Sequence, residues 1–192
     1  ELAFYHVTRA TPFRGSSPAS QPVTWFWSAV QTTPAGNNIP VTTAARGGGS
    51  GVRLGGAGTT TALGYPDPFR EINLTLQKAA ESGWSGVWEY AATVNAQGQV
   101  VSWKPLPLLA DTTAGQRQNG RLTFDPPRDW QPASLSGGPR LYYVRFRVTA
   151  GTSEAQAIWQ SALGRDYVQA NGGTSGVIPA FDASADRDGD GY

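Results

Sequence analysis

The chain has 192 residues, of which 39% are hydrophobic and 15% charged, with 24 glycines, 14 prolines and no cysteine. This length suits one sizeable hydrophobic core, while so many glycines and prolines exclude a fold of long helices and the missing cysteines exclude disulfides and thiolate metal sites. Fifteen basic residues nearly balance 14 acidic ones, and without a basic run to follow a phosphate backbone we expect no nucleic-acid partner.

The start of the chain and its hydropathy indicate where it acts. The sequence begins at Glu1 and contains no methionine, so we expect a processed mature protein or a piece of a longer one, at an extracellular or cell-surface location. It holds no apolar stretch of about 18 residues. We therefore expect no transmembrane segment.

The first expected element is a strand over residues 2–9, where apolar and polar residues partly alternate. A linker rich in serine and proline follows it, so residues 1–22 are expected to form an N-terminal strand and linker. Such a strand can pair with an open sheet edge of a neighbouring subunit. The residues proposed for this assembly strand are Leu2, Phe4, His6 and Thr8.

The next segments are a strand, a short return strand and a glycine-rich loop. Aromatic and β-branched residues favour a strand over residues 23–30, which would place Trp25 and Trp27 on the same side. Residues 39–43 follow as a short edge strand. Residues 46–58 are so rich in glycine that we expect a flexible loop with no part in the core, or a backbone that another group approaches closely; a spacer loop is the preferred interpretation.

The middle of the chain contains one strand with a clear alternating pattern and, after it, two segments that predict a hairpin. Residues 71–77 alternate with a period of two, which places Ile72, Leu74 and Leu76 on one buried face. Residues 86–93 and 100–108 have the composition of strands, and the turn-forming residues between them predict a hairpin.

Three more strands complete the expected domain. They cover residues 120–124, residues 141–149 and, with a short helix as the alternative, residues 153–163. Many short strands at this spacing predict an all-β fold, a two-sheet antiparallel sandwich that is jelly-roll-like. The expected boundaries of this domain are residues 23 and 180.

Several short motifs follow one another in a characteristic order. They are Pro68-Phe69, Trp88-Glu89-Tyr90, Trp103, a strand from Gly120 followed by Pro126-Pro127-Arg128-Asp129-Trp130, and Tyr143-Val144-Arg145-Phe146-Arg147-Val148. Together they resemble a β-sandwich module of large bacterial surface proteins and phage tail-type proteins. The resemblance implies an architectural or adhesive unit and gives no catalytic residue to carry over.

The acidic tail, residues 181–192, has the spacing of a calcium loop. Asp186, Asp188 and Asp190 are alternate carboxylates followed by a glycine and Tyr192, as in the first half of an EF-hand or dockerin-type loop. The predicted cofactor is therefore calcium, and the alternative is a solvated acidic tail. The twelfth position of the loop would fall beyond Tyr192, so a longer parent chain, another loop or a neighbouring subunit would complete the site.

The sequence favours no catalytic mechanism, and we expect a non-enzyme. His6 is the sole histidine, and the chain has neither a Gly-x-Ser-x-Gly motif nor a histidine pair, which excludes a serine triad and a zinc hydrolase. Paired carboxylates can hydrolyse glycosides, but spacing singles out no pair among the candidates. These are Glu71, Glu81, Glu89, Asp111 and Asp129.

Two functional hypotheses remain. The first is a structural subunit of a filament, surface layer or tail, which associates with itself or with neighbouring domains by strand exchange and is stiffened by calcium. The second is a carbohydrate-binding or adhesion module, because aromatic faces stack on sugar rings. Large aromatics more often fill cores, so we favour the structural subunit. The glycan-binding candidates are Trp25, Trp27, Trp84, Trp103 and Trp130.

Overall fold

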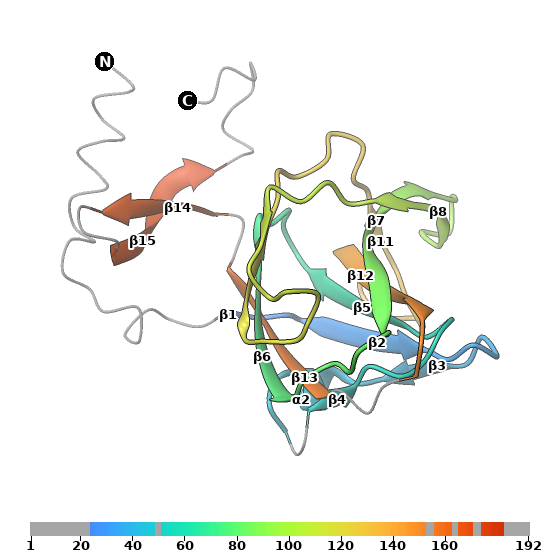
Figure 1. Cartoon of the computed structure of the whole chain (residues 1–192). Coiled ribbons are helices and arrows are strands. Elements are labelled where there is room, and N and C mark those ends of the chain that lie inside the picture. The colour runs from blue at the N-terminus through green and yellow to red at the C-terminus, as the bar shows by residue number, and fades with distance from the viewer. Residues whose placement is uncertain (1–23, 49–50, 153–155, 163–164, 171–173, 183–192) are drawn as a thin grey trace.

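A computed structural model describes residues 24–48, 51–152, 156–162, 165–170 and 174–182. Its main body consists of two antiparallel sheets that pack face to face (Figure 1), which confirms the predicted all-β sandwich. The helix α2 (Thr42–Ala45) is a single turn at the end of the short strand β3. Within the described part of the chain, no helix has the length and apolar character needed to cross a membrane.

The first sheet has β6 near its centre, between β13 and β10. Its order is β1-β13-β6-β10-β9, and β4 pairs with β13 in addition. The bounds of its strands are β1 (Thr24–Trp25), β4 (Val52–Arg53), β6 (Glu71–Lys78), β9 (Ala110–Asp111), β10 (Gly120–Thr123) and β13 (Gln156–Ala162).

The second sheet has β5 and β12 at its centre and β3 and β8 at its edges. Its order is β3-β2-β5-β12-β7-β8, and β11 pairs with the start of β12. A separate two-stranded sheet, β14 with β15, pairs with neither sheet of the sandwich among the described residues. The bounds are β2 (Ser28–Thr32), β3 (Asn38–Pro40), β5 (Thr60–Tyr65), β7 (Ser85–Val94), β8 (Val100–Pro105), β11 (Pro132–Ala133), β12 (Leu141–Ala150), β14 (Arg165–Ala170) and β15 (Thr174–Asp182).

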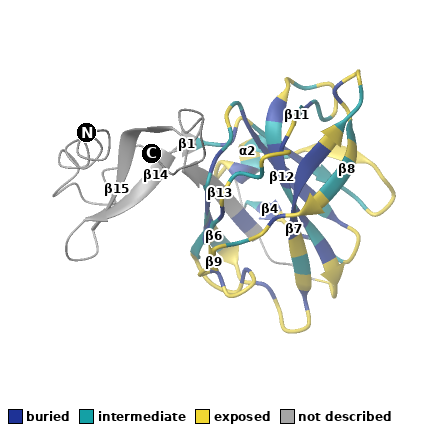
Figure 2. Ribbon diagram, turned by 90° about the horizontal axis from the view of Figure 1, so that it is seen from above, coloured by how far each residue is buried: buried dark blue, intermediate teal, exposed yellow. Residues whose placement is uncertain are grey.

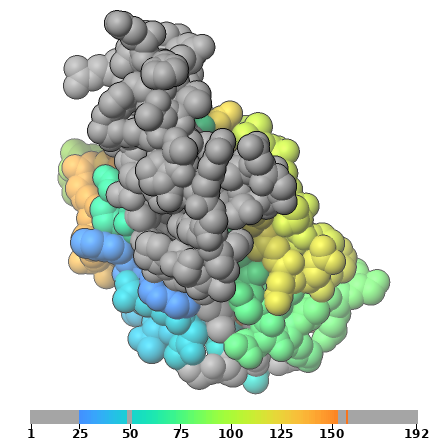
Figure 3. Space-filling model, turned by 90° about the vertical axis from the view of Figure 1, so that its left-hand side faces the viewer, coloured from blue at the N-terminus to red at the C-terminus, as the bar shows by residue number. Residues whose placement is uncertain are grey.

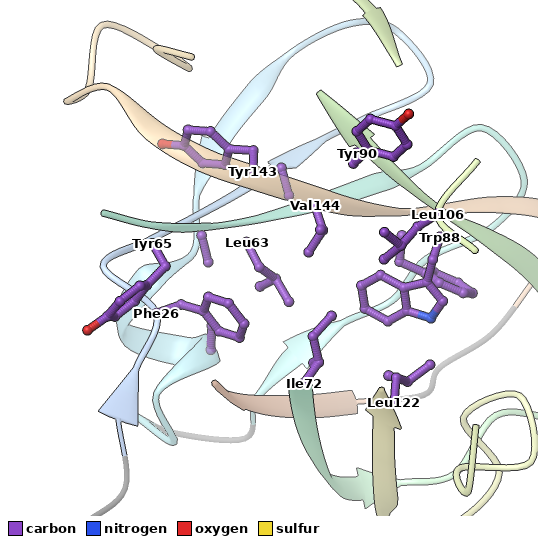
Figure 4. Close-up of a cluster of buried hydrophobic side chains, with 14 of the residues drawn as sticks. Phe26, Leu63, Tyr65, Ile72, Trp88, Tyr90, Leu106, Leu122, Tyr143 and Val144 are labelled. Atoms are coloured by element: carbon purple, nitrogen blue, oxygen red, sulfur yellow. The ribbon is translucent and has the colours of Figure 1, made fainter. Parts of the chain in front are cut away.

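The hydrophobic core lies between the two sheets. Figure 4 shows Ile72 and Leu122 of the first sheet directed towards Leu63, Val144 and Trp88 of the second. Buried positions concentrate on the strands, while the exposed positions lie mainly in the connecting loops (Figure 2). Because each fully buried aliphatic or aromatic side chain contributes about 1.5–3 kcal/mol, this layer is the main source of stability.

An aromatic cluster closes one end of the core around Phe69, which is completely buried. The Phe69 ring centroid lies 5.2 Å from Phe26, 5.7 Å from Phe124 and 5.0 Å from Trp130, each in an edge-on arrangement. Such pairs stabilise by about 0.5–1.5 kcal/mol beyond the area they bury. We call these four residues the aromatic seam, because they come from segments far apart in the sequence.

Two sequence-based expectations for the N-terminal third were wrong. Residues 23–30 do not form one strand, because the chain leaves the first sheet after β1 and enters the second at β2. Phe26 turns into the aromatic seam at this crossing, so Trp25 and Trp27 do not share the face of one strand. The glycine-rich segment is also part of the core, since Val52 and Leu54 are buried.

Candidate functional site

Two groups of predicted site residues fall outside the described part of the chain. They are the assembly strand (Leu2, Phe4, His6 and Thr8) and the calcium loop (Asp186, Asp188, Asp190 and Tyr192). Within the residues that the structure describes, no cluster of three or more metal-ligating side chains is present. Strand exchange and calcium binding therefore stay predictions.

The glycan-binding candidates lie on separate elements. Trp84 and Trp130 are buried in the core, and Trp25 is half-buried on β1. Trp103, on the edge strand β8, is covered by the guanidinium of Arg145, 4.3 Å above its ring. Trp27 alone of the five is largely exposed, at 59%. These placements favour a role in packing for most of the set.

A compensated charge cluster occupies the outer face of the second sheet. Glu89 on β7 lies opposite Arg145 on β12, and only 6% of Glu89 is exposed. Its carboxylate accepts hydrogen bonds from Arg145 Nε at 2.7 Å and from Arg147 Nη2 at 2.8 Å. Burial alone would raise the pKa of Glu89, but the hydrogen bonds from the two arginines outweigh it and hold the pKa below its ordinary value. A carboxylate held in this way is a poor proton donor.

A second cluster joins the β7–β8 hairpin to the Pro-Pro turn. The Tyr90 hydroxyl donates a hydrogen bond of 2.8 Å to Asp129 Oδ1, and Lys104 Nζ lies 2.6 Å from Asp129 Oδ2. The Lys104 hydrogen bond, helped by that of Tyr90, lowers the pKa of Asp129. Asp129 therefore positions the turn that brings Trp130 into the aromatic seam.

A cavity of about 320 Å³ opens beside the start of β7. The segments that line it are the start of β7, the end of β8 and the loop between β9 and β10. The loop between β9 and β10, drawn in yellow-green to yellow, reaches the molecular surface in Figure 3. Its apolar wall includes Trp88, Leu106, Leu108 and Phe146.

Gln116 is the unusual polar residue of this cavity. It is only 1% exposed, yet neither its side-chain oxygen nor its side-chain nitrogen has a hydrogen-bond partner in the described structure. Its main chain is fully engaged: the Gln116 N–H donates to Thr113 Oγ1 at 3.1 Å, and the carbonyl accepts from the Ala80 N–H at 3.0 Å. An unpaired buried amide costs about 1–3 kcal/mol.

The loop that carries Gln116 is strained and fixed. Ala114, Gly115 and Gln116 follow one another with φ angles of 51°, 69° and 66°. This left-handed region costs about 1–2 kcal/mol for a residue with a side chain. Asp111 Oδ1 holds the loop in place, accepting from the Thr113 N–H at 2.7 Å and from the Thr113 hydroxyl at 2.6 Å. Strain held by local hydrogen bonds is typical of binding and catalytic sites.

The sequence singles out two residues of this cavity, Trp84 and Asp111, but not the cavity itself. Residues 111–120 contain turn-forming types, but neither the left-handed run nor the burial of Gln116 has a signature in a single sequence. Of the carboxylates considered for glycoside hydrolysis, only Asp111 lines the cavity. No second carboxylate lies there to form a catalytic pair.

Comparison with known proteins adds no relative. No family model, no curated protein and no solved structure matches the chain. The resemblance to modules of bacterial surface and phage tail-type proteins, which covers a little under half of the sequence, accordingly stays a prediction.

Proposed function

We propose that the chain is a non-catalytic structural module of an extracellular or cell-surface assembly, such as a filament, a surface layer or a tail. The observation that supports this proposal is the engagement of its charged and aromatic groups in the sandwich itself. Glu89 is neutralised by two arginines, Asp129 by Lys104, and the aromatic seam is buried. A packed sandwich with compensated charges suits a structural unit that tiles with its neighbours.

Strand exchange is the proposed means of assembly. The second sheet ends in two different edges, β3 and β8. Both strands end in a proline, Pro40 in β3 and Pro105 in β8, but β3 has only two residues ahead of its proline, and so short an edge resists pairing with another chain. The six-residue strand β8 is longer, and its Val101 is 67% exposed. We therefore propose β8 as the acceptor of the assembly strand, residues 2–9, of a second copy.

Sedimentation velocity over a range of protein concentrations tests this mode of assembly. The full chain is expected to form large species that disappear when residues 2–9 are deleted. Val101→Lys should also block assembly, because a charge on an edge strand disfavours pairing. Leu109→Lys is the matched control, because Leu109 is 68% exposed but pairs with Thr123 beside the first sheet.

Two results would contradict the assembly model. Large species that survive the deletion of residues 2–9 would rule out strand exchange through that segment. Equal assembly by Val101→Lys and Leu109→Lys would rule out β8 as the acceptor edge.

Calcium is proposed to stiffen the joint through the loop at residues 186–192. Binding to the folded state raises the melting temperature by mass action. We expect calcium to raise the melting temperature of the full chain and Asp188→Asn to abolish the rise, while Asp67→Asn, an exposed aspartate in another loop, leaves it intact. Absence of both calcium heat and thermal shift in the full chain would rule out calcium binding by this chain alone.

The alternative, a carbohydrate-binding or adhesion module, is supported by one specific observation. It is the cavity of about 320 Å³ beside β7, which has an apolar wall and which Trp84 alone of the five tryptophans considered from the sequence lines.

A further inference from the structure

We propose that the cavity beside β7 receives the indole ring of Trp27 from a second copy of the chain. This inference rests on the self-assembly proposed above and adds a second contact to strand exchange. Among the aromatic residues whose exposure the structure describes, Trp27 alone is largely exposed, at 59%. Tryptophan is one of the residues that most often anchor an interface by filling a pocket of the partner.

The backbone around Trp27 is held on both sides. Its N–H donates to the Gly64 carbonyl at 2.9 Å, and its carbonyl accepts from Arg46 Nη2 at 3.4 Å. Arg46 Nε also donates to the carbonyl of Phe26 at 2.9 Å, and the Phe26 ring packs in the aromatic seam. A preorganised group loses less conformational entropy when it binds. Trp27 is therefore a fixed projection at the crossing from β1 to β2.

The cavity has the size and the wall for one large apolar side chain. Its volume of about 320 Å³ equals that of about ten water molecules at about 30 Å³ each, which is room for a single aromatic group. Pro105, Leu106 and Leu108 belong to its wall, and Val87, also in the wall, is 37% exposed. Covering this apolar surface with an indole favours association.

Two exposed charged groups of the cavity wall suit an indole. A tryptophan ring N–H needs an acceptor when it is buried. Asp111 Oδ1 is engaged by Thr113, while its other carboxylate oxygen makes no hydrogen bond to a described residue. Arg117, which donates to the carbonyls of Ala114 and Trp84, brings a guanidinium to the wall, a favourable neighbour for an aromatic face.

Charge complementarity matches the two surfaces as well. Arg46, exposed beside Trp27, forms no ion pair with a described carboxylate, and Asp111 forms none with a described cation. Docking of Trp27 brings the cation of Arg46 towards the carboxylate of Asp111. Such a pair at the rim of an interface contributes mainly to orientation and to the rate of association.

The cavity is continuous with the edge proposed to accept residues 2–9. Pro105, the last residue of β8, lines it. The chain between residue 9 and Trp27 reaches at most about 60 Å when fully extended, whereas β8 is about 20 Å long. One second copy can therefore pair with β8 and fill the cavity at its end. Two linked contacts reinforce each other, because the first raises the effective concentration of the second.

The two surfaces of this contact belong to different parts of the chain. Trp27 lies between β1 and β2, whereas the cavity is formed by β7, β8 and the loop between β9 and β10. A contact between two different surfaces is heterologous and repeats from copy to copy, so it builds a ring or an open filament. The Trp27 contact thus matches the extended assemblies of the proposed function.

Hydroxyl-radical footprinting of the full chain, read by mass spectrometry at low and high protein concentration, tests the contact. We expect oxidation of Trp27 and of Leu108 in the cavity wall to fall together at high concentration. Ile39, which is 44% exposed on β3, serves as the reference and should stay equally oxidised.

Trp27→Ala removes the ring, and Leu108→Lys blocks the cavity. In sedimentation velocity we expect each change to weaken association by at least about tenfold, the loss typical of an interface anchor. Ile39→Ala should leave association unchanged. Val87→Lys blocks the cavity from a more exposed position if Leu108→Lys lowers the melting temperature. A mixture of Trp27→Ala and Leu108→Lys regains one intact contact and should associate more strongly than either variant alone.

Three results would overturn the Trp27 contact. They are a Trp27 that stays accessible in assembled material, equal association by Trp27→Ala and Ile39→Ala, or a mixture that associates no better than its components. Protection of the cavity wall by a neutral sugar, with Trp27 still accessible, would assign the cavity to the carbohydrate-binding alternative instead.

The failure of this contact is distinguishable from the failure of the proposed function. Assembly that is lost on deletion of residues 2–9 but unchanged in Trp27→Ala would keep strand exchange and reject the Trp27 contact. A full chain that stays monomeric, with Trp27 accessible at every concentration, would reject both.

Discussion

Glu89 is an acidic residue whose role depends on partners distant in sequence. Arg145 and Arg147 lie 56 and 58 positions further along the chain and meet Glu89 only because β7 and β12 pair. The sequence indicates strands at both places but not their register. The sequence therefore does not distinguish Glu89 from the four other candidate carboxylates. Its pairing with two arginines follows only from the way the strands pair in the fold.

Replacing Glu89 tests the charge cluster. Glu89→Gln leaves Arg145 half-buried without a countercharge, and removing one partner of a buried ion pair costs about 3–5 kcal/mol. Because Arg147 is 41% exposed and Arg145 21%, solvent reduces this to about 2 kcal/mol at neutral pH. Urea unfolding measures the difference. Glu81→Gln, in a surface pair with Lys78, should cost less than about 0.5 kcal/mol, and an equal cost in both variants would contradict the assignment.

Glu71 and Glu89 should respond to acid with opposite signs. Burial raises the pKa of Glu71 despite the nearby Arg121, so the folded state binds its proton more readily than the unfolded state. Stability is therefore expected to rise as the pH falls through the raised pKa of Glu71, down to the ordinary pKa of a glutamate. Below that, the contribution of Glu89 is lost as the pH falls through its lowered pKa.

Melting temperature measured against pH separates the two residues. Glu71→Gln should lack the rise on mild acidification, and Glu89→Gln should lack the part of the acid loss that Glu89 causes. A Glu71→Gln profile that superimposes on that of the original chain would contradict the first expectation.

The strands that the sequence revealed are those with one exposed face. β6 has Ile72 and Leu74 buried and Thr75 exposed, and the expected strand over residues 71–77 is confirmed there. The β7–β8 hairpin and β12 are also confirmed: β12 mixes buried and partly exposed residues, β7 is buried in its middle, and β8 has only partly or fully exposed residues. The strand preferred over a helix at residues 153–163 is confirmed as β13, which pairs with β6.

β5 shows why other elements could not be predicted. It lies between β2 and β12, and its residues from Thr61 to Tyr65 are all buried, so the sequence has no period of two to detect. The threonines and the glycine of β5 form a central strand only because β2 and β12 pair with β5 on its two sides. The break between β1 and β2 was missed for a similar reason, since it depends on where Phe26 packs.

Gly64 is the critical position of β5. A Cβ atom there would collide with the ring of Tyr143, its cross-strand partner on β12. Gly64→Ala should destabilise the fold by about 2 kcal/mol through overpacking, a fall of about 4–8 °C in melting temperature. Gly56→Ala is the control, because its nearest neighbour would be 3.3 Å away. If the double variant Gly64→Ala, Tyr143→Leu is more stable than Gly64→Ala alone, the loss of stability is due to this contact. If Gly64→Ala loses no stability, the predicted collision is contradicted.

At the scale of the whole molecule, the described part of the sandwich combines a packed core with a cavity beside β7. The aromatic seam, the Glu89 cluster and the Asp129 cluster each join segments from different parts of the chain. The buried side-chain amide of Gln116 and the Tyr143 hydroxyl, which have no hydrogen-bond partner in the described structure, depart from this pattern of paired groups.

Electron microscopy of the intact chain in calcium tests the central claim, that this sandwich is an assembly module, most directly. We expect regular filaments or sheets at high protein concentration, and dispersed particles of single-chain size once residues 2–9 are deleted. Dispersed particles from the intact chain at every concentration, with or without calcium, would contradict the proposed structural role.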